Sequence, residues 1–460
     1  MIEHSEPLNF SLEINHPITM TNDTNSSDTL DGNVAWILIA ACFTWLMTPG
    51  IGLFYSGLAR RKNALSLIML CFLTIPIVST QWFIWGYSLA FSRNASPYVG
   101  SFQNIFFSNL DWDSGPTNSS RNIPEFLFAF YECMFAILAS AIIIGGAAER
   151  IRIFPTIMFT FFWSTLVYDV IASWCWSTNG WFAEWGTLDY AGGLPVHISS
   201  GTAALVFCLI VGRRLENNGL RSHRVIDVVP HNIINVVIGT VFLWFGWFGF
   251  NGGSALAANK RSIMACIVTN LSASLGGLTW MFIDFWRNEN LYAVSFCSGA
   301  ISGLVTITSG AGYVSPLSAV VFGIVGGSVC NCVARLKFAL NVDDSMDVFA
   351  IHCVGGLLGN ILTGIFADKN IASLSGEIIL GGALINGNYY QIWIQLKTSL
   401  IGIVYSFLVT IVILYFIEYL LRCRLRLNPA GELDGTDLTE HGESAYCFAD
   451  SPEENFVRIN

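Results

Sequence analysis

The sequence predicts an all-α polytopic membrane protein with about eleven transmembrane helices. Of its 460 residues, 53% are hydrophobic and only 12% are charged, about half the charged fraction of a typical soluble domain. A helix needs about 20 mainly apolar residues to cross a bilayer, and segments of that length recur between short polar breaks. The predicted spans are residues 33–56, 65–91, 124–146, 154–175, 191–212, 231–251, 262–284, 292–309, 316–334, 347–366 and 398–421.

The distribution of basic residues predicts how these spans are oriented. Lys and Arg in short loops collect on the cytoplasmic side of a membrane. Alternate loops, together with the segment after the last span, are rich in them: Arg60, Arg61, Lys62, Arg150, Arg152, Arg213, Arg214, Arg221, Arg224, Arg287, Arg335, Lys337, Arg422, Arg424 and Arg426. The opposite loops carry mainly Arg93, Arg121, Lys260, Arg261 and Lys369. We therefore expect the N-terminus outside and the C-terminus inside.

The chain divides into three predicted regions. Residues 1–32 form a polar extracellular tail without the apolar segment and cleavage site of a signal peptide. Residues 33–421 form the membrane domain, and residues 422–460 form an acidic cytoplasmic tail. Glycosylation sequons on the predicted outer side indicate a glycoprotein, and we expect it in the plasma membrane; the sequons start at Asn9, Asn22, Asn25, Asn94 and Asn118.

Cysteine and charge usage exclude several other classes of protein. Most of the twelve cysteines, such as Cys71 and Cys208, lie in apolar runs where they pack as small hydrophobic residues. We therefore predict no disulfide framework and no zinc site. The net charge of −10 resides largely in the tails and loops, and we expect no nucleic-acid partner.

Two histidines lie within otherwise apolar spans, His197 in the fifth and His352 in the tenth. Ionisable residues at membrane depth are costly and usually face a cavity or a partner, although a satisfied core histidine is the better explanation for either one alone. The two spans have matching rank in successive five-helix halves, and inverted repeats bring equivalent residues together at the midplane. Each His also follows an Asp near the start of its span, Asp189 and Asp347.

Residues 189–197 (DYAGGLPVH) closely resemble the signature of the ammonium transporter and methylammonium permease family. Further blocks resemble the family in order along the chain: TPG at 48–50, GYSLAF at 86–91, AER at 148–150, GWFGFN at 246–251, DVFAIH at 347–352, and Asp437 with HGESAY at 441–446. The Asp-Tyr-Ala-Gly-Gly block fits the ammonium transporter branch better than the Rhesus branch. The resemblance implies a homotrimer in which each subunit has its own pore, with two inverted five-helix repeats plus a final helix.

The resemblance also implies roles for individual residues. Trp176, Ser254 and Phe135 match a site that binds ammonium in an outer vestibule, and an aromatic face attracts a cation by about 0.5–2 kcal/mol. Phe135 and Phe250 match two stacked rings that close the pore. His197 and His352 match its lining, and Asp189 matches an acid that organises the vestibule without binding the ligand. For Trp176 alone, a place in the interfacial aromatic belt is about equally good, and with 34 Phe in the chain any single one is more often packing.

Two neighbouring residues depart from what is common in the family. Tyr131 replaces a frequent Phe one turn before Phe135. Glu132 stands where many relatives have Gln or another uncharged residue. Glu132 is either a protonated residue in a subunit contact or a residue that alters proton handling beside the pore. We prefer the first, because its helical phase is about 100° from that of Tyr131 and Phe135, which face the pore by resemblance.

The function implied by the resemblance is transmembrane transport of ammonium or ammonia, and of methylammonium. Moving a bare monovalent ion into a low-dielectric pore costs several kcal/mol, so potassium and sodium should be rejected, whereas ammonium can lose a proton and pass as ammonia. Whether transport carries charge stays open. The alternatives are an ammonium sensor, a Rhesus-type neutral gas channel and a metal enzyme. Two His without a third ligand make a poor metal site, so we expect no enzyme activity, catalytic residue, metal or cofactor.

Overall fold

The structure is a computed structural model that describes residues 23–117, 119–215, 224–225 and 228–446. This part of the chain is helical and contains no strand, and Ile151 and Arg426 form an isolated antiparallel bridge. Ten helical segments are long and apolar enough to cross a membrane, and an eleventh, Ala293–Thr308, is shorter. The all-α fold with eleven spans is therefore confirmed.

The spans follow one another along the chain, and several of them include a wider π-helical turn. The label η marks such turns and also the short 3₁₀ helices η1, η3, η4 and η8. The spans are α1 Asp23–Leu58; α2 Ala64–Gln81 with η2 Trp82–Gly86 and α3 Tyr87–Phe91; α4 Glu125–Ile144; α5 Ile153–Trp163 with η5 Ser164–Tyr168 and α6 Asp169–Trp176; η6 Gly193–Ile198 with α8 Ser199–Val211; α9 Ile233–Gly253; α10 Lys260–Asn288; α11 Ala293–Thr308; α12 Pro316–Leu340; η7 Phe349–Val354 with α13 Gly355–Phe366; and α16 Tyr390–Tyr415 with η9 Phe416–Leu420. Shorter elements lie between or after them: η1 Arg61–Asn63, η3 Ile105–Phe107, η4 Gly145–Ala147, α7 Trp181–Glu184, α14 Lys369–Ala372, η8 Ser373–Ser375, α15 Ala383–Asn386, α17 Pro429–Asp434 and η10 Asp437–His441.

Some helix ends differ from those predicted. The last span begins at Tyr390 rather than at residue 398, because its first turns carry glutamines that are polar but buried. Gln391 donates to the Gly186 carbonyl oxygen (2.8 Å), and Gln395 bonds both the N–H and the carbonyl oxygen of Leu188. At the other end of the chain, α1 already begins at Asp23, inside the predicted polar tail.

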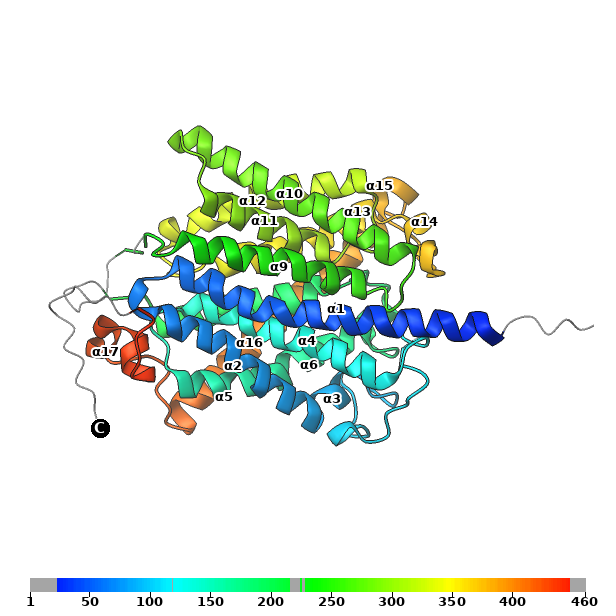
Figure 1. Ribbon diagram of the computed structural model, residues 1–460, viewed down its shortest axis with the longest axis horizontal. Coiled ribbons are helices and arrows are strands. Elements are labelled where there is room, and N and C mark those ends of the chain that lie inside the picture. The colour runs from blue at the N-terminus through cyan, green and yellow to red at the C-terminus, as the bar shows by residue number, and fades with distance from the viewer. Residues whose placement is uncertain (1–22, 118, 216–223, 226–227, 447–460) are drawn as a thin grey trace, which may run out of the picture.

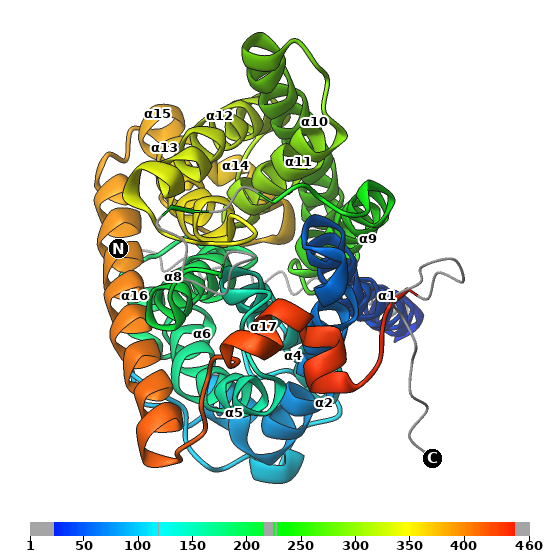
Figure 2. The same cartoon turned by 90° about the vertical axis from the view of Figure 1, so that its left-hand side faces the viewer.

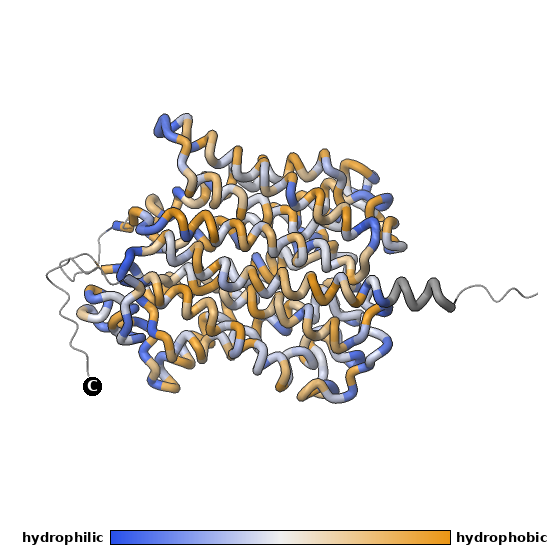
Figure 3. The backbone as a smooth tube through the Cα atoms, viewed as in Figure 1, coloured by the Kyte–Doolittle hydropathy of each residue, from blue (hydrophilic) through white to orange (hydrophobic). Residues whose placement is uncertain are grey.

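The helices run side by side along one direction (Figure 1). The start of α1 marks one end, here called the outer end, and α17 lies across the other, the inner end (Figures 1 and 2). Hydrophobic residues fill the middle of the bundle while hydrophilic ones gather at both ends (Figure 3). This arrangement is what eleven membrane crossings require, and exposed apolar side chains such as Val404 and Val412 offer a surface to lipid.

The first ten spans form two halves that meet at the centre of the bundle. The helix α1 packs along α9, the first span of the second half, and η6 contacts η7. Asp189 lies eight residues before His197, and Asp344 lies eight residues before His352. Each of these acids accepts a hydrogen bond from the backbone N–H five residues later: Asp189 from Leu194 (2.6 Å) and Asp344 from Phe349 (2.8 Å).

The equivalent of Asp189 is therefore Asp344, and the predicted equivalence with Asp347 is wrong. Asp347 instead forms an ion pair with Lys337 at 2.7 Å. The two equivalent acids lie toward opposite ends of the bundle: Asp189 lines the outer cavity described below, whereas Asp344 is next to Asp343 in a cluster at the inner end. The halves are thus inverted with respect to each other.

The inner end is held together by buried ion pairs and by the C-terminal tail. The Arg214 guanidinium joins Glu149, after α4, to Asp343, after α12. In the tail, the Asp437 carboxylate accepts from the backbone N–H groups of Leu65 (3.0 Å) and Ser66 (2.8 Å) and so caps the start of α2. The tail is therefore docked on the membrane domain.

The predicted glycosylation sites are only partly covered by the described residues. Asn9, Asn22 and Asn118 lie outside them, and Asn25 falls within α1. Asn94 is exposed in the loop after α3. Glycosylation at all of these positions stays a prediction.

Candidate functional site

A cavity of about 570 Å³ opens at the outer end. It is lined by residues from α4, from the end of α6, from the segment after α9 and from residues 375–379. Four side chains that the sequence analysis singled out for the vestibule line it: Trp176, Ser254, Phe135 and Asp189. Residues far apart in the chain therefore meet in the outer cavity.

Two stacked phenylalanine rings lie next to the outer cavity. Phe135 from α4 and Phe250 from α9 have ring centroids 4.1 Å apart and an angle of 23° between their planes. The Trp176 ring meets Phe135 edge to face at 6.1 Å. Its indole N–H donates to the Asp189 carbonyl oxygen (2.9 Å), which fixes the orientation of the ring. Both phenylalanines are buried, so the stack separates the outer cavity from the interior.

Hydroxyl groups surround the end of α9. Ser254 Oγ donates to the Phe250 carbonyl oxygen (2.8 Å), so its lone pairs remain to accept a hydrogen bond from a ligand. The Tyr131 hydroxyl donates to the same carbonyl oxygen (2.8 Å) and lies 3.5 Å from Ser254 Oγ. Tyr131 thus adds a tie between α4 and α9 that a phenylalanine in its place would lack.

The two histidines meet at the centre of the bundle. His197 Nδ1 and His352 Nδ1 are 3.2 Å apart, and both imidazoles are buried. A hydrogen bond between them requires one Nδ1 to carry a proton and the other to be free of one, so at least one imidazole is neutral. His197 also stacks on Trp247, with centroids 5.4 Å apart. Its Nε2 has no hydrogen-bond partner among the described residues.

Local backbone structure positions both histidines. Each lies in a π-helical turn, η6 or η7, that leads into an α-helix, α8 or α13. Such turns widen the helix and occur frequently at functional sites. Among the described residues, no group of three or more His, Cys, Asp or Glu is arranged to hold a metal ion.

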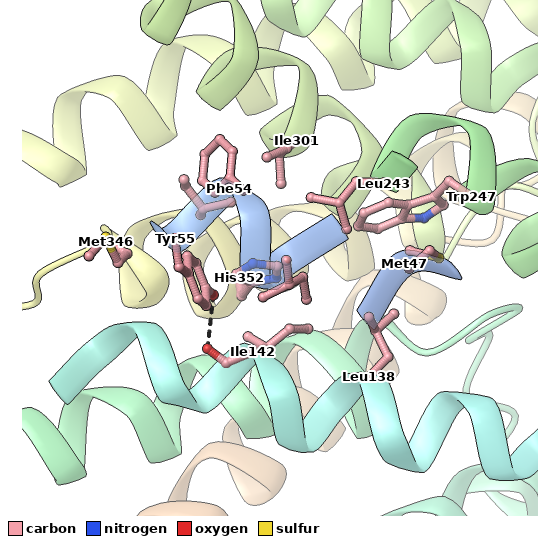
Figure 4. A pocket seen from close by; sticks show the side chains of 12 residues that line it. Met47, Phe54, Tyr55, Leu138, Ile142, Leu243, Trp247, Ile301, Met346 and His352 are labelled. Carbon is pink, nitrogen blue, oxygen red and sulfur yellow. Dashed lines mark hydrogen bonds between the residues drawn. The ribbon is translucent and has the colours of Figure 1, made fainter. Parts of the chain in front are cut away.

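A second, much smaller cavity lies beyond the histidines. Its volume is about 10 Å³, close to the 10–15 Å³ that one water needs. His352 contributes to its wall, which is otherwise mainly apolar, with Met47 from α1, Leu138 from α4, and Leu243 and Trp247 from α9 (Figure 4). The polar group of Tyr55 is occupied, because its hydroxyl donates to the Ile142 carbonyl oxygen (2.9 Å). A site with these walls suits a small neutral molecule better than an ion.

The Asp189 carboxylate is turned toward the backbone. One oxygen accepts from the N–H groups of Gly192 (2.8 Å) and Gly193 (2.7 Å), and the other accepts from Leu194 (2.6 Å). Burial raises its pKa to about 6, while these three donors act to lower it. The turn needs Gly192, whose φ of 106° is in the left-handed region. Both carboxylate oxygens are therefore engaged in organising the start of η6.

Burial gives the Asp344 carboxyl a similar environment. Burial and the neighbouring Asp347 raise the pKa of Asp344 to about 7. The sequence analysis missed this residue, although the shared spacing of eight residues to each His would have identified it. It also missed Trp247 and Tyr55, for which the sequence offers no signal beyond their apolar surroundings.

The preferred prediction for Glu132, a subunit contact on an outward-facing surface, is wrong. It is only 8% exposed within a single chain and lines the outer cavity. The prediction failed because it assumed that the face of α4 turned away from the pore would face outward. In the structure α4 is enclosed by its own chain on almost every side, and seventeen of its residues are buried.

Comparison with known proteins places the chain in a family. Residues 35–446 match the model of the Ammonium Transporter Family. Ammonium transporter 1 of Schizosaccharomyces pombe is 46% identical over 425 residues, which cover 92% of this chain and 84% of that protein. Ammonium transporter MEP2 of Saccharomyces cerevisiae is 43% identical over 436 residues, covering 93% and 86%. The crystal structure of Candida albicans Mep2 aligns with a TM-score of 0.81 at 42% identity and 86% coverage of each chain. The chain therefore belongs to the Ammonium Transporter Family, in its ammonium transporter branch.

Proposed function

We propose that this protein transports ammonium and methylammonium across a membrane through a pore within each subunit. One observation carries the proposal: in a single chain of this family, the outer cavity, the stacked Phe135 and Phe250, the paired His197 and His352 and the apolar inner cavity are neighbours in that order. The order matches the stages that passage of ammonium requires.

The first stage is recruitment of the cation in the outer cavity. The Trp176 ring offers a π face, and the free lone pairs of Ser254 Oγ accept an N–H from ammonium. Potassium and sodium have no N–H to donate, so the hydroxyl adds directional preference for ammonium and methylammonium. Asp189 supports this stage indirectly, because its carbonyl oxygen fixes the indole.

The second stage is removal of the charge at the phenylalanine stack. Beyond the rings the walls are almost entirely apolar, and an ion entering them loses several kcal/mol of hydration that they cannot replace. Ammonium avoids that cost by leaving a proton behind and continuing as ammonia. An alkali ion has no such route and is excluded.

The third stage is passage of ammonia along the histidine pair. In the neutral state each imidazole can donate from one nitrogen and accept at the other, so the pair can hold a small molecule that does both. Transfer of the left-behind proton along the shared Nδ1–Nδ1 bond would make transport electrogenic. If the pair only orients ammonia, transport is neutral.

The setting that we propose is a glycosylated homotrimer in the plasma membrane, with the N-terminal tail outside. The basic residues of the predicted inner loops and the place of the Asn94 sequon at the outer end support this orientation.

The test is voltage clamp and labelled methylammonium uptake in cells that express the protein, with His352→Ala and Trp176→Leu alongside. Trp286→Leu is the matched control, because that tryptophan is 82% exposed near the end of α10. A saturable current that is lost with His352→Ala, reduced but not lost with Trp176→Leu, and unchanged in the control would establish charge-coupled transport by this path. Uptake without current would establish neutral passage. Neither signal, with the protein confirmed at the surface, would refute transport and favour an ammonium sensor.

A further inference from the structure

One carboxylate in the wall of the outer cavity has no partner. Glu132 lies on α4, one residue after Tyr131 and three before Phe135, and its side chain lines the cavity. The residue is 92% buried, which follows from its 8% exposure. Oε2 is inaccessible and has no hydrogen-bond partner, and no hydrogen bond or ion pair joins Oε1 to a described residue. The group therefore faces the cavity without compensation from the protein.

Each of the other charged side chains of the same wall is held by hydrogen bonds or an ion pair. Asp189 accepts three backbone N–H groups. Glu377 pairs with Arg261 and accepts from the Tyr313 hydroxyl (3.0 Å). The Arg261 guanidinium also lies between two tyrosine rings, each 4.7 Å from its carbon, and donates to the Gly312 carbonyl oxygen. Among the described charged residues of the cavity wall, Glu132 alone has no bond.

A buried carboxylate without a partner is costly, and the cost falls if a cation or a hydrogen-bond donor binds it. The cavity is the side from which such a ligand can come. Phe128, Phe135, Cys175 and Trp176 line it together with Glu132. A small cation held against the aromatic rings there would therefore meet a negative charge and an acceptor oxygen on the same wall.

We infer that the Glu132 carboxylate is an additional binding group for small ammonium-type cations in the outer cavity. It bonds an N–H of ammonium or methylammonium while Trp176 and Phe135 present their ring faces. The inference rests on the proposed function and deepens it, since it assigns the affinity of the outer site partly to a charged residue. A carboxylate in this place also raises the local concentration of cations at the entrance to the pore.

The test compares two measurements on purified protein. Methylammonium binding is measured by calorimetry in detergent, and the KM of labelled methylammonium uptake is measured in liposomes. Glu132→Gln keeps the shape and removes the charge, and we expect both the Kd and the KM to rise at least fivefold, about 1 kcal/mol. Glu132→Asp withdraws the carboxylate by one methylene, and we expect a two- to fivefold rise. This second variant keeps the test decisive if Glu132→Gln folds poorly.

Asp169→Asn is the matched control. Asp169 is a fully buried acid on α6, outside the cavity wall, whose Oδ2 accepts from Gln81 Nε2 (2.6 Å). We expect its Kd and KM to stay at the wild-type values. An equal rise in Asp169→Asn and Glu132→Gln would overturn the inference, because it would show a distant field effect instead of a contact.

Two further results separate this inference from the proposed function. Wild-type values of Kd and KM in both Glu132 variants overturn the inference and leave transport standing. Binding that depends on Glu132 in a protein that does not move methylammonium supports the inference and refutes transport. A wild-type protein that neither binds nor transports methylammonium refutes both.

Discussion

Replacing Arg214 by alanine should destabilise the inner end of the bundle strongly. The guanidinium is 3% exposed and is held by both of its carboxylate partners. Its Nη1 lies 2.5 Å from Glu149 Oε2, and its Nη2 and Nε lie 2.7 and 3.0 Å from the two oxygens of Asp343. These acids follow α4 and α12, so one side chain connects the two halves of the chain.

The loss of stability in Arg214→Ala can be worked out from the lowered pKa values of the two acids. Burial alone would raise the pKa of Glu149, but Arg214 and Arg60 lower it from 4.5 to about 2. Burial would also raise the pKa of Asp343, but Arg214 and Arg150 lower it from 3.8 to about 2. At about 1.4 kcal/mol per pH unit, these changes correspond to roughly 3 and 2 kcal/mol. Arg60 and Arg150 contribute part of these two pKa changes, so their full sum is not lost with Arg214. We therefore expect Arg214→Ala to lower the free energy of unfolding by about 3–5 kcal/mol, the usual range for breaking a buried pair.

The assay is thermal unfolding of the detergent-purified protein at a fixed heating rate. Both acids have folded-state pKa values below the ordinary ones, so their stabilisation is present above about pH 4 and disappears as pH falls through about 2. The wild type should therefore lose more stability than Arg214→Ala between pH 5 and pH 2.

Arg335→Ala is the control for this experiment. Arg335 pairs with Asp284 at 2.8 Å but is 47% exposed, so its loss should cost at most about 1 kcal/mol. Equal melting temperatures for the two variants at neutral pH, or a pH dependence of Arg214→Ala identical to that of the wild type, would refute the reasoning.

Three other changes have defined outcomes. Trp176→Leu should raise the KM of methylammonium uptake about 2- to 30-fold, the equivalent of 0.5–2 kcal/mol of cation–π attraction, with little change in maximal rate; a lower maximal rate at an unchanged KM would contradict this. Tyr131→Phe removes the hydroxyl bond to the Phe250 carbonyl oxygen and should lower stability by about 0.5–1.5 kcal/mol, seen as a lower melting temperature; an unchanged melting temperature would argue that the bond contributes nothing. Asp437→Ala removes the cap of α2 at a cost of about 0.5–2 kcal/mol, so a protease should cleave the C-terminal tail faster than in the wild type; equal cleavage rates would mean that the tail is held by other contacts.

Much of the fold was predictable because a bilayer demands long apolar helices. The eleven spans follow from apolar length alone, and their ends were least certain where polar residues are buried by tertiary contacts. Gln391 and Gln395 begin the last span although they look like loop residues, because their amides bond the backbone before η6. Such partners lie about 200 residues away and leave no local mark in the sequence.

The candidate site was predictable to the extent that motifs identify it. The aromatic and histidine residues named from the family resemblance do come together in the structure. The acid of the second half was misassigned, because the DVFAIH block draws attention to Asp347 while the spacing to His352 selects Asp344. The place of Glu132 was missed because helical phase gives direction around an axis and says nothing of what surrounds the helix.

The central claim is that ammonium passes through one subunit beside the paired histidines. The most direct measurement is the ammonium-driven current of purified protein in proteoliposomes, with potassium as the comparison ion. The wild type is compared with a double variant that carries both His197→Ala and His352→Ala. The wild type should give a saturable response to ammonium, as current or as a change of internal pH, and none to potassium, and the double variant should lose that selectivity or that response. A double variant that responds to ammonium and excludes potassium as the wild type does would contradict the account.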